Sequence, residues 1–269
     1  MSTVSAPTSN LLTVTATPAR QTYLIDGISR TTCRGYIYLY TCWISMLFCA
    51  AYAVALIAFG NTIPISFVAL SVLHCGIVSA HCAICVEYHM ADIYFKNYIK
   101  EHMHDYELRI QKYDWILAYA MNAISCILYN TMLILRESNL HGLNYILYTT
   151  SAAKVALLLV FAISLKIPVS NQWNIFIIVG VILSVTDAAT VSALVAYYNY
   201  GYIHSTGILA LFVVTVILAI VGTSTYVAGQ ILNPNQSPHF DTHDVMHVGI
   251  VAAILTSYVS IGLFIFDKI

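Results

Sequence analysis

Histidines are the residues of this chain whose spacing points most directly to chemistry. His243 and His247 stand four residues apart at the start of an apolar stretch, and His74 and His81 stand seven apart in another. Both spacings place the two imidazoles on one face of a helix. Neutral imidazoles so placed are good zinc ligands, and Asp114 could hold the water that an open zinc site activates. These residues are therefore candidates for a zinc site. The alternatives are histidines that only support the structure, or a haem held by two of them.

Two ionisable residues interrupt other apolar stretches. Lys154 stands near the middle of one stretch, and Asp187 stands near the middle of the next. A charge inside a membrane is costly, so such residues are usually paired and often functional. We expect them to form an ion pair, acting as a clamp between two helices or as a proton or ion relay. They are also the candidate site for a chromophore.

The composition sets the class of protein that must position these residues. Of 269 residues, 59% are hydrophobic and 9% are charged, whereas an average soluble domain has roughly 25% charged residues. This indicates an all-α membrane protein, and no basic stripe suggests nucleic acid. The seven cysteines show no disulfide framework. Cys82 and Cys85 resemble half of a zinc motif without a second pair, and we expect no metal role for them.

Hydropathy predicts seven transmembrane helices. The predicted spans are 35–60, 62–86, 113–135, 142–165, 173–198, 206–232 and 244–266. Residues 87–112 mix charges with apolar residues at helical spacing, so we expect an amphipathic helix on the membrane surface between spans two and three. Residues 1–30 are rich in Ser and Thr and are expected to form a disordered polar tail before a membrane domain at 31–269.

The distribution of Lys and Arg predicts the orientation of the bundle. The N-terminal side holds Arg20, Arg30, Arg34, Lys96, Lys100, Arg109, Lys112 and Lys166, and the other side holds Arg136 and Lys268. Positive residues concentrate in cytoplasmic segments. We therefore expect a cytoplasmic N-terminus and an outside C-terminus, which is opposite to the orientation of G-protein-coupled receptors.

Several segments of this inverted bundle resemble the heliorhodopsins, a family of retinal proteins with the same orientation. The resemblance rests on Phe67-Val-Ala-Leu-Ser71 in the second span, Ala118-Tyr-Ala-Met-Asn-Ala123 in the third, and Trp173-Asn-Ile-Phe176 followed by Gly180 in the fifth. It extends from span two to span seven. It implies a seven-helix fold with a polar centre.

The residues that bind retinal in that family are missing here. The lysine that would form the Schiff base falls at Ala253 or Ile254, and the glutamate counterion falls near Ala118. A protonated Schiff base needs its counterion, so the joint absence of both is physically coherent. The resemblance thus implies a scaffold without covalent retinal, in which Lys154 and Asp187 supply the polar anchor.

A second resemblance is to the seven-helix metal hydrolases that include alkaline ceramidases and adiponectin-type receptors. Members carry Ser-x-x-x-His in helix two, Asp near helix three and His-x-x-x-His in helix seven. Here His243-Asp-Val-Met-His247 fits, whereas Ser71-Val-Leu-His74 is one residue short. The resemblance implies that His81 or His74 would hold zinc with the helix-seven pair. Asp114 would orient water toward a lipid amide or ester.

The reading that we favour from the sequence is a heliorhodopsin-like integral membrane protein without the usual Schiff base. It would act as a sensor, a ligand-binding protein or a structural and interaction subunit. The alternatives are a zinc-dependent intramembrane hydrolase and a transporter built on the Lys154–Asp187 pair. We expect no cofactor in the favoured case and zinc in the hydrolase case. Expected partners are the lipid bilayer, a lipophilic small molecule and other subunits of a homo-oligomer or membrane complex.

Overall fold

The seven predicted spans are confirmed as seven long helices. The computed structural model describes residues 23–25, 28–30, 32–59, 63–94, 103–137, 142–166, 172–232 and 242–266. The helices are α1 (Thr32–Phe59), α2 (Ile65–Tyr94), α3 (Met103–Arg136), α4 (Leu143–Ser164), α5 (Gln172–Asn199), α6 (Thr206–Leu232) and α7 (Thr242–Phe266). Each contains a segment long and apolar enough to cross a membrane. The chain is therefore a multi-pass integral membrane protein with an all-α bundle. Its orientation in the membrane stays a prediction.

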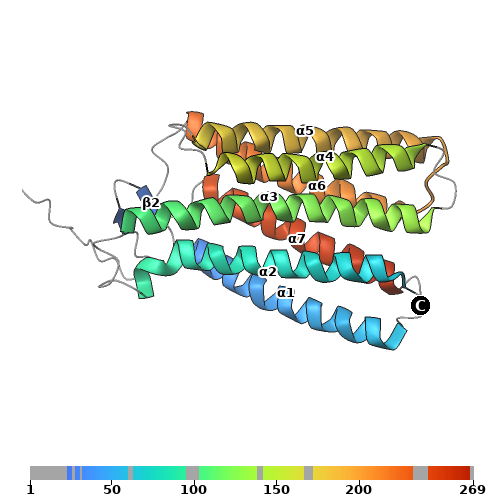
Figure 1. The fold of residues 1–269 in the computed structure, drawn as a ribbon, viewed down its shortest axis with the longest axis horizontal. Helices are drawn as coiled ribbons and strands as arrows, with labels where there is room; N and C mark the ends of the chain where they lie inside the picture. The colour runs from blue at the N-terminus through green and yellow to red at the C-terminus, as the bar shows by residue number, and fades with distance from the viewer. Residues whose placement is uncertain are drawn as a thin grey trace, which may run out of the picture.

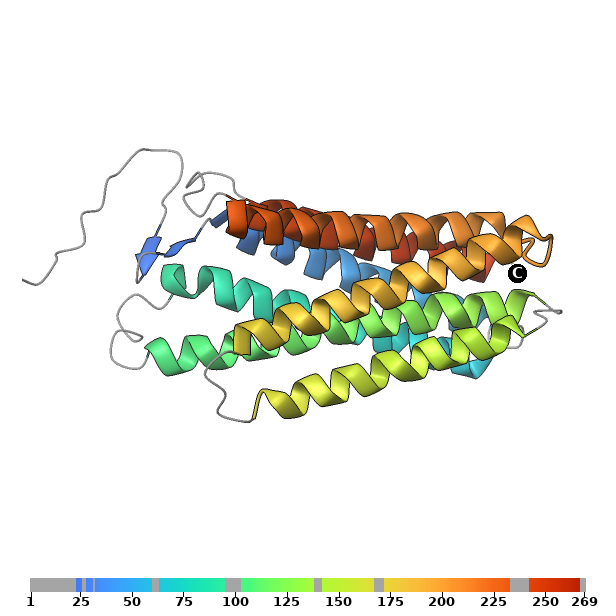
Figure 2. The same ribbon diagram turned by 90° about the horizontal axis from the view of Figure 1, so that it is seen from above.

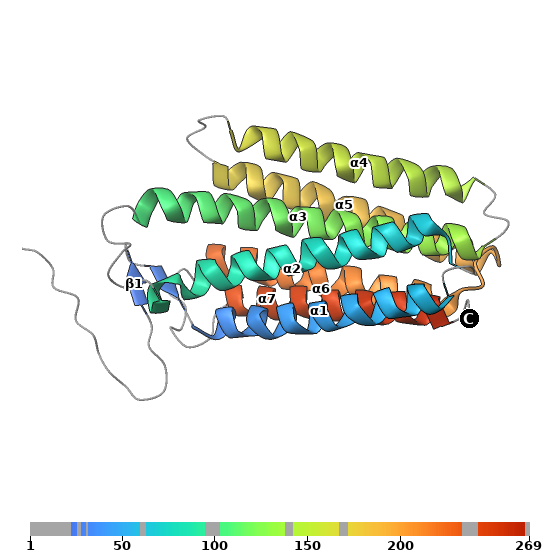
Figure 3. The same cartoon turned by 60° about the horizontal axis from the view of Figure 1, so that its bottom comes forward.

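The helices form a closed bundle in which the first and last helices meet. Figures 1 and 2 show them running lengthwise, with the starts of α1, α3, α5 and α7 at one end. We call this the N-terminal end. Each helix packs against the next one along the chain, from α1 to α7. The ring closes between α1 and α7, which lie side by side in Figure 3.

The stretch expected to form a surface helix is divided between two spans. Residues 87–94 continue α2, and 103–112 begin α3. The part at 95–102 lies outside the described residues. The structure thus differs from the prediction of a separate helix in the residues that it describes. Charges among apolar residues at helical spacing also occur where a helix projects beyond the bilayer, and periodicity alone does not reveal a change of direction.

Two short strands occupy the end of the predicted polar tail. Strands β1 (Tyr23–Ile25) and β2 (Ile28–Arg30) pair antiparallel, with Tyr23 opposite Arg30. Asp-Gly, the sequence between them, strongly favours a two-residue hairpin connection. These six residues lie in the segment predicted to be a disordered polar tail, and that prediction stays untested. The expectation for residues 1–22 lies outside the described part of the chain.

Small residues bring α6 and α7 close together. A Cβ added at Gly249 would lie 2.9 Å from the carbonyl oxygen of Leu218 and 3.2 Å from the Cα of Gly222. Both are backbone atoms, so a larger residue would force the helices apart. Lipid removes much of the hydrophobic drive between helices, and close backbone packing takes its place.

We expect Gly249→Ala to lower the free energy of unfolding by about 1–3 kcal/mol, because the added methyl overpacks the helix contact. Gly262→Ala is the matched control on the same helix, since a Cβ there would meet nothing within 4 Å. Equilibrium unfolding of both variants in bicelles measures the difference. Equal stabilities would show that the contact tolerates the methyl.

A carboxylate ties the end of α3 to the start of α6. Glu137 Oε1 accepts hydrogen bonds from the backbone N–H of His204 at 2.9 Å, the N–H of Ser205 at 2.8 Å and the Ser205 hydroxyl at 2.6 Å. Burial favours the neutral acid, but the bonds from Ser205 and His204 outweigh it. They hold the pKa of Glu137 below its ordinary value. The charged form therefore stabilises the folded chain.

This contact predicts an acid-dependent loss of stability. A lowered folded pKa gives stabilisation that is complete above the unfolded pKa of about 4.3 and is lost as the pH falls through the folded value. Glu137→Gln is expected to cost about 1–2 kcal/mol at neutral pH and to remove that part of the acid dependence. Thermal unfolding of both proteins at neutral pH and in acid tests this. Identical acid dependence in the two would contradict it.

Candidate metal centre

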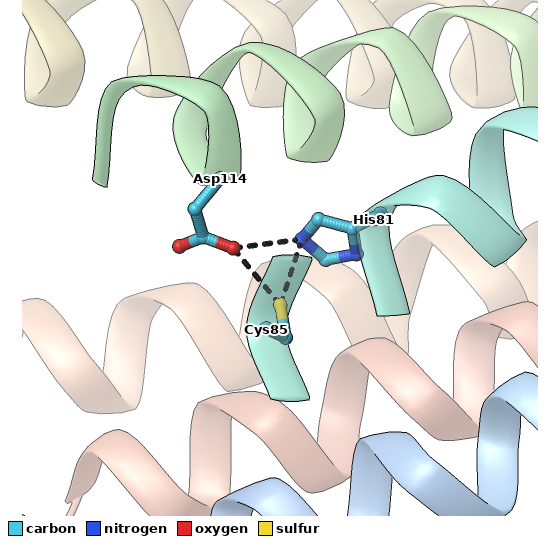
Figure 4. Close-up of side chains that lie close together, drawn as sticks. All are labelled: His81, Cys85 and Asp114. Carbon is cyan, nitrogen blue, oxygen red and sulfur yellow. Dashed lines mark hydrogen bonds and ion pairs between the residues drawn. The ribbon is translucent and has the colours of Figure 1, made fainter. Parts of the chain in front are cut away.

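Three side chains that can bind metal converge between α2 and α3. His81 and Cys85 are four residues apart on α2, so they share one face of that helix. Asp114 reaches them from α3, as Figure 4 shows. The Cys85 thiol donates to Asp114 Oδ1 at 2.9 Å, and His81 Nε2 lies 3.3 Å from the same oxygen. The remaining pair, Cys85 Sγ and His81 Nε2, is 3.4 Å apart.

These separations are close to those of ligands around one ion. Two donors at about 2.0–2.3 Å from a tetrahedral zinc ion lie roughly 3.3–3.7 Å apart. The two distances from His81 fall in this range. The distance from Cys85 to Asp114 is shorter because a thiol proton lies between them, and metal binding displaces that proton. Only small movements would bring all three donors around an ion.

A second layer of rings joins this group to α1 and α7. The Tyr38 hydroxyl lies 2.6 Å from His247 Nδ1, and the Tyr38 ring meets both His81 and His247 edge-on. The ring of His243 stacks on that of His247, with centroids 4.5 Å apart. Of the histidine pair on α7, His247 therefore lies next to the donor group. His243 lies one turn nearer the end of the helix.

The donor group is largely shielded from water. The side chain of His81 is 2% exposed and that of Asp114 is 16% exposed, while Cys85 is fully buried. A carboxylate at such a site needs a positive partner, which a bound cation would supply. Asp114 is thus the donor most open to an incoming molecule.

Exposed aromatic residues lie toward both ends of the bundle, and one set lies level with the donor group. Those at the N-terminal end are Tyr36, Tyr40, Trp43 and Tyr113; those at the other end are Tyr145, Tyr148, Tyr198, Tyr200 and Tyr202. Tyr and Trp are enriched where the bilayer meets water. In the sequence, Tyr38 lies between Tyr36 and Tyr40, and Asp114 directly follows Tyr113. The donor group therefore lies at the depth of one interface.

The other buried histidine of α2, His74, lies apart from the donor group. His74 is fully buried two turns from His81, with Nε2 3.0 Å from Ser125 Oγ and its ring edge-on to Tyr258. It is thus held inside the bundle by a serine hydroxyl. The structure brings together His81, Asp114 and, through Tyr38, His247. His74 is not part of this group.

The expected buried ion pair is present and has a third member. Lys154 Nζ lies 2.5 Å from Asp187 Oδ1, and both side chains are almost completely buried. Asn122 on α3 accepts a hydrogen bond from Lys154 at 2.7 Å and donates one to Asp187 Oδ2 at 2.9 Å. The three residues join α3, α4 and α5. The asparagine satisfies a hydrogen-bonding group on each ion, which a buried pair requires.

Sequence reasoning missed Cys85, Tyr38 and Asn122. For Cys85 a pattern was present, because His81-x-x-x-Cys85 places two ligands on one helix face, as His243-x-x-x-His247 does. The Cys82-x-x-Cys85 pair instead resembled half of a zinc motif, for which no metal role was expected. Tyr38 is one of twenty tyrosines, and nothing in the sequence distinguishes it. Only the packing of α1 against α2 and α7 shows its role.

Together the bundle and this site describe a multi-pass membrane protein in which three side chains that could hold a metal ion converge toward one end of the helices. Comparison with protein-family models, with curated proteins and with solved structures finds no match. The resemblances to heliorhodopsins and to seven-helix metal hydrolases therefore stay predictions.

Proposed function

We propose that this chain is a zinc-dependent membrane hydrolase that acts on a lipid ester or amide. The observation that carries the proposal is the convergence of His81, Cys85 and Asp114, with separations of 2.9–3.4 Å. Three protein ligands and one open position are typical of catalytic zinc sites, whereas structural sites have four protein ligands. The geometry thus favours the zinc-dependent hydrolase, which was the alternative to the heliorhodopsin-like reading of the sequence.

Each residue of the site has a distinct task in this proposal. His81 and Cys85 hold the ion from one face of α2, and Asp114 holds it from α3. Zinc bound there would polarise a carbonyl and activate water. The larger exposure of Asp114 places the open position on its side. Helices α1, α2 and α7 exclude water from the opposite side.

The depth of the site supports a lipid substrate. The donor group lies level with the exposed aromatic residues of the N-terminal end, which mark the interface between bilayer and water. Ester and amide carbonyls that join lipid chains to their headgroups lie in this same layer. A substrate carbonyl would therefore meet the metal without leaving its natural depth.

Hydrolysis of labelled lipids tests the proposal. The protein is reconstituted in nanodiscs that contain a fluorescent lipid ester or a fluorescent lipid amide, and fatty-acid release is followed with zinc and with a chelator. We expect zinc-dependent release that is lost in Asp114→Asn. Activity should remain in Glu87→Gln, an exposed carboxyl variant near the same end of α2. Zinc binding without hydrolysis of either substrate would contradict the catalytic role.

A retinal-free, heliorhodopsin-like scaffold is the second candidate, and the Lys154–Asn122–Asp187 network favours it. This network supplies a buried polar anchor across three helices, the role that the resemblance implied. An absorption spectrum of protein expressed with retinal tests whether Lys154 carries a chromophore. A featureless visible spectrum is expected. A band that hydroxylamine bleaches would show a Schiff base and overturn the retinal-free reading.

A further inference from the structure

Tyr38 occupies the centre of the second layer around the proposed metal site. It is fully buried, although tyrosine is usually only partly buried because its hydroxyl needs a polar partner. That hydroxyl lies 2.6 Å from His247 Nδ1. The ring edges meet His81 and His247 at centroid distances of 5.5 and 5.0 Å. One side chain of α1 thus contacts both α2 and α7 at the site.

The donor group lies within electrostatic reach of Tyr38 and His247. Cys85 and Asp114 both interact electrostatically with Tyr38, and His247 interacts with Asp114. The ring of Tyr38 contacts His81, and its hydroxyl is hydrogen-bonded to His247. Tyr38 therefore links the histidine of α7 to a proposed metal ligand of α2 through one side chain.

We infer that Tyr38 is a positioning residue of the metal site, one that holds His247 beside the donor group and packs against the ring of His81. The inference rests on the proposed metal site. Partners of this kind fix the tautomer and orientation of imidazole ligands, and their loss typically weakens metal binding about 10–100-fold. Through this hydrogen bond Tyr38 fixes the ring of His247, which interacts electrostatically with the proposed ligand Asp114.

The ring and the hydroxyl of Tyr38 make separable contributions. The edge-on contacts to the two histidines come from the ring, and phenylalanine would keep them. The hydrogen bond to His247 comes from the hydroxyl, and phenylalanine would lose it. Tyr38→Phe therefore tests positioning with little change in packing volume.

The test compares zinc affinity in Tyr38→Phe with that in Tyr52→Phe, measured by competition with a chromophoric chelator. Tyr52 is the matched control, because it is a buried α1 tyrosine whose hydroxyl donates to the Tyr258 carbonyl, away from the site. We expect zinc binding to weaken about 10–100-fold in Tyr38→Phe and to stay unchanged in Tyr52→Phe. Unchanged affinity in Tyr38→Phe would overturn the inference.

A double-mutant cycle with His247→Ala separates positioning from general loss of structure. If the hydroxyl acts through His247, the effects on zinc affinity are non-additive, and the double variant is little weaker than His247→Ala alone. Additive effects would mean that Tyr38 does not act through His247. Absence of zinc binding in the wild-type protein would instead contradict the metal site itself, so the two failures are distinguishable.

Discussion

Lys154→Met is expected to lower the free energy of unfolding by about 3–5 kcal/mol, because it leaves a buried carboxylate without its partner. Asp187 is 4% exposed, and its remaining contact, Asn122, donates a single hydrogen bond. Asp187→Asn should cost a similar amount by leaving a buried ammonium. These effects exceed those of ordinary surface substitutions, which stay within about 0.5 kcal/mol.

The double variant Lys154→Met/Asp187→Asn should regain most of the lost stability, since replacing both ions of a buried pair is often nearly neutral. Equilibrium unfolding by SDS in bicelles gives all four free energies. Lys166→Met, an exposed lysine on the same segment, is the control for loss of a charge. A double variant no more stable than the worse single variant would mean that the two ions do not stabilise each other.

Removing a proposed metal ligand should weaken zinc binding more than Tyr38→Phe does. His81→Ala is expected to weaken binding by more than about 100-fold, because loss of an outer-shell partner alone can cost that much. Cys85→Ser should behave similarly, since a hydroxyl is a poorer zinc ligand than a thiolate. Titration with zinc against a chromophoric chelator gives the dissociation constants.

His74→Ala is the matched control for this prediction. It removes a buried histidine from the same helix, two turns away, where the ring contacts Ser125 and Tyr258. It should lower stability while leaving zinc affinity unchanged. Equal weakening of zinc binding by His74→Ala and His81→Ala would show a non-specific effect of disturbing α2.

The fold could be predicted largely from the sequence because membrane spans have a strong local pattern. Long apolar stretches predicted the seven helices, because the length and hydropathy of a stretch are enough to identify a membrane span. The region at 87–112 was harder, because charges among apolar residues suit both a surface helix and helix ends beyond the bilayer. For strands β1 and β2 the sequence held one local signal, the Asp26-Gly27 pair that favours a hairpin connection.

The site was predictable only where residues share a helix or a depth. Lys154 and Asp187 could be paired because each lies near the middle of an adjacent span. His81 and Asp114 were both candidates for a zinc site, but nothing in the sequence showed that they face each other. Tyr38 belongs to the site through packing between α1 and α7, helices at opposite ends of the chain. Such long-range contacts leave no local pattern.

X-ray absorption at the zinc edge of the purified, zinc-loaded protein would test the central claim most directly. The proposed site predicts one tightly held ion per chain, bound by a single sulfur at about 2.3 Å together with nitrogen and oxygen ligands at about 2.0–2.2 Å. The sulfur contribution should disappear in Cys85→Ser. A wild-type protein that retains no zinc, or zinc with no sulfur ligand, would contradict the site formed by His81, Cys85 and Asp114.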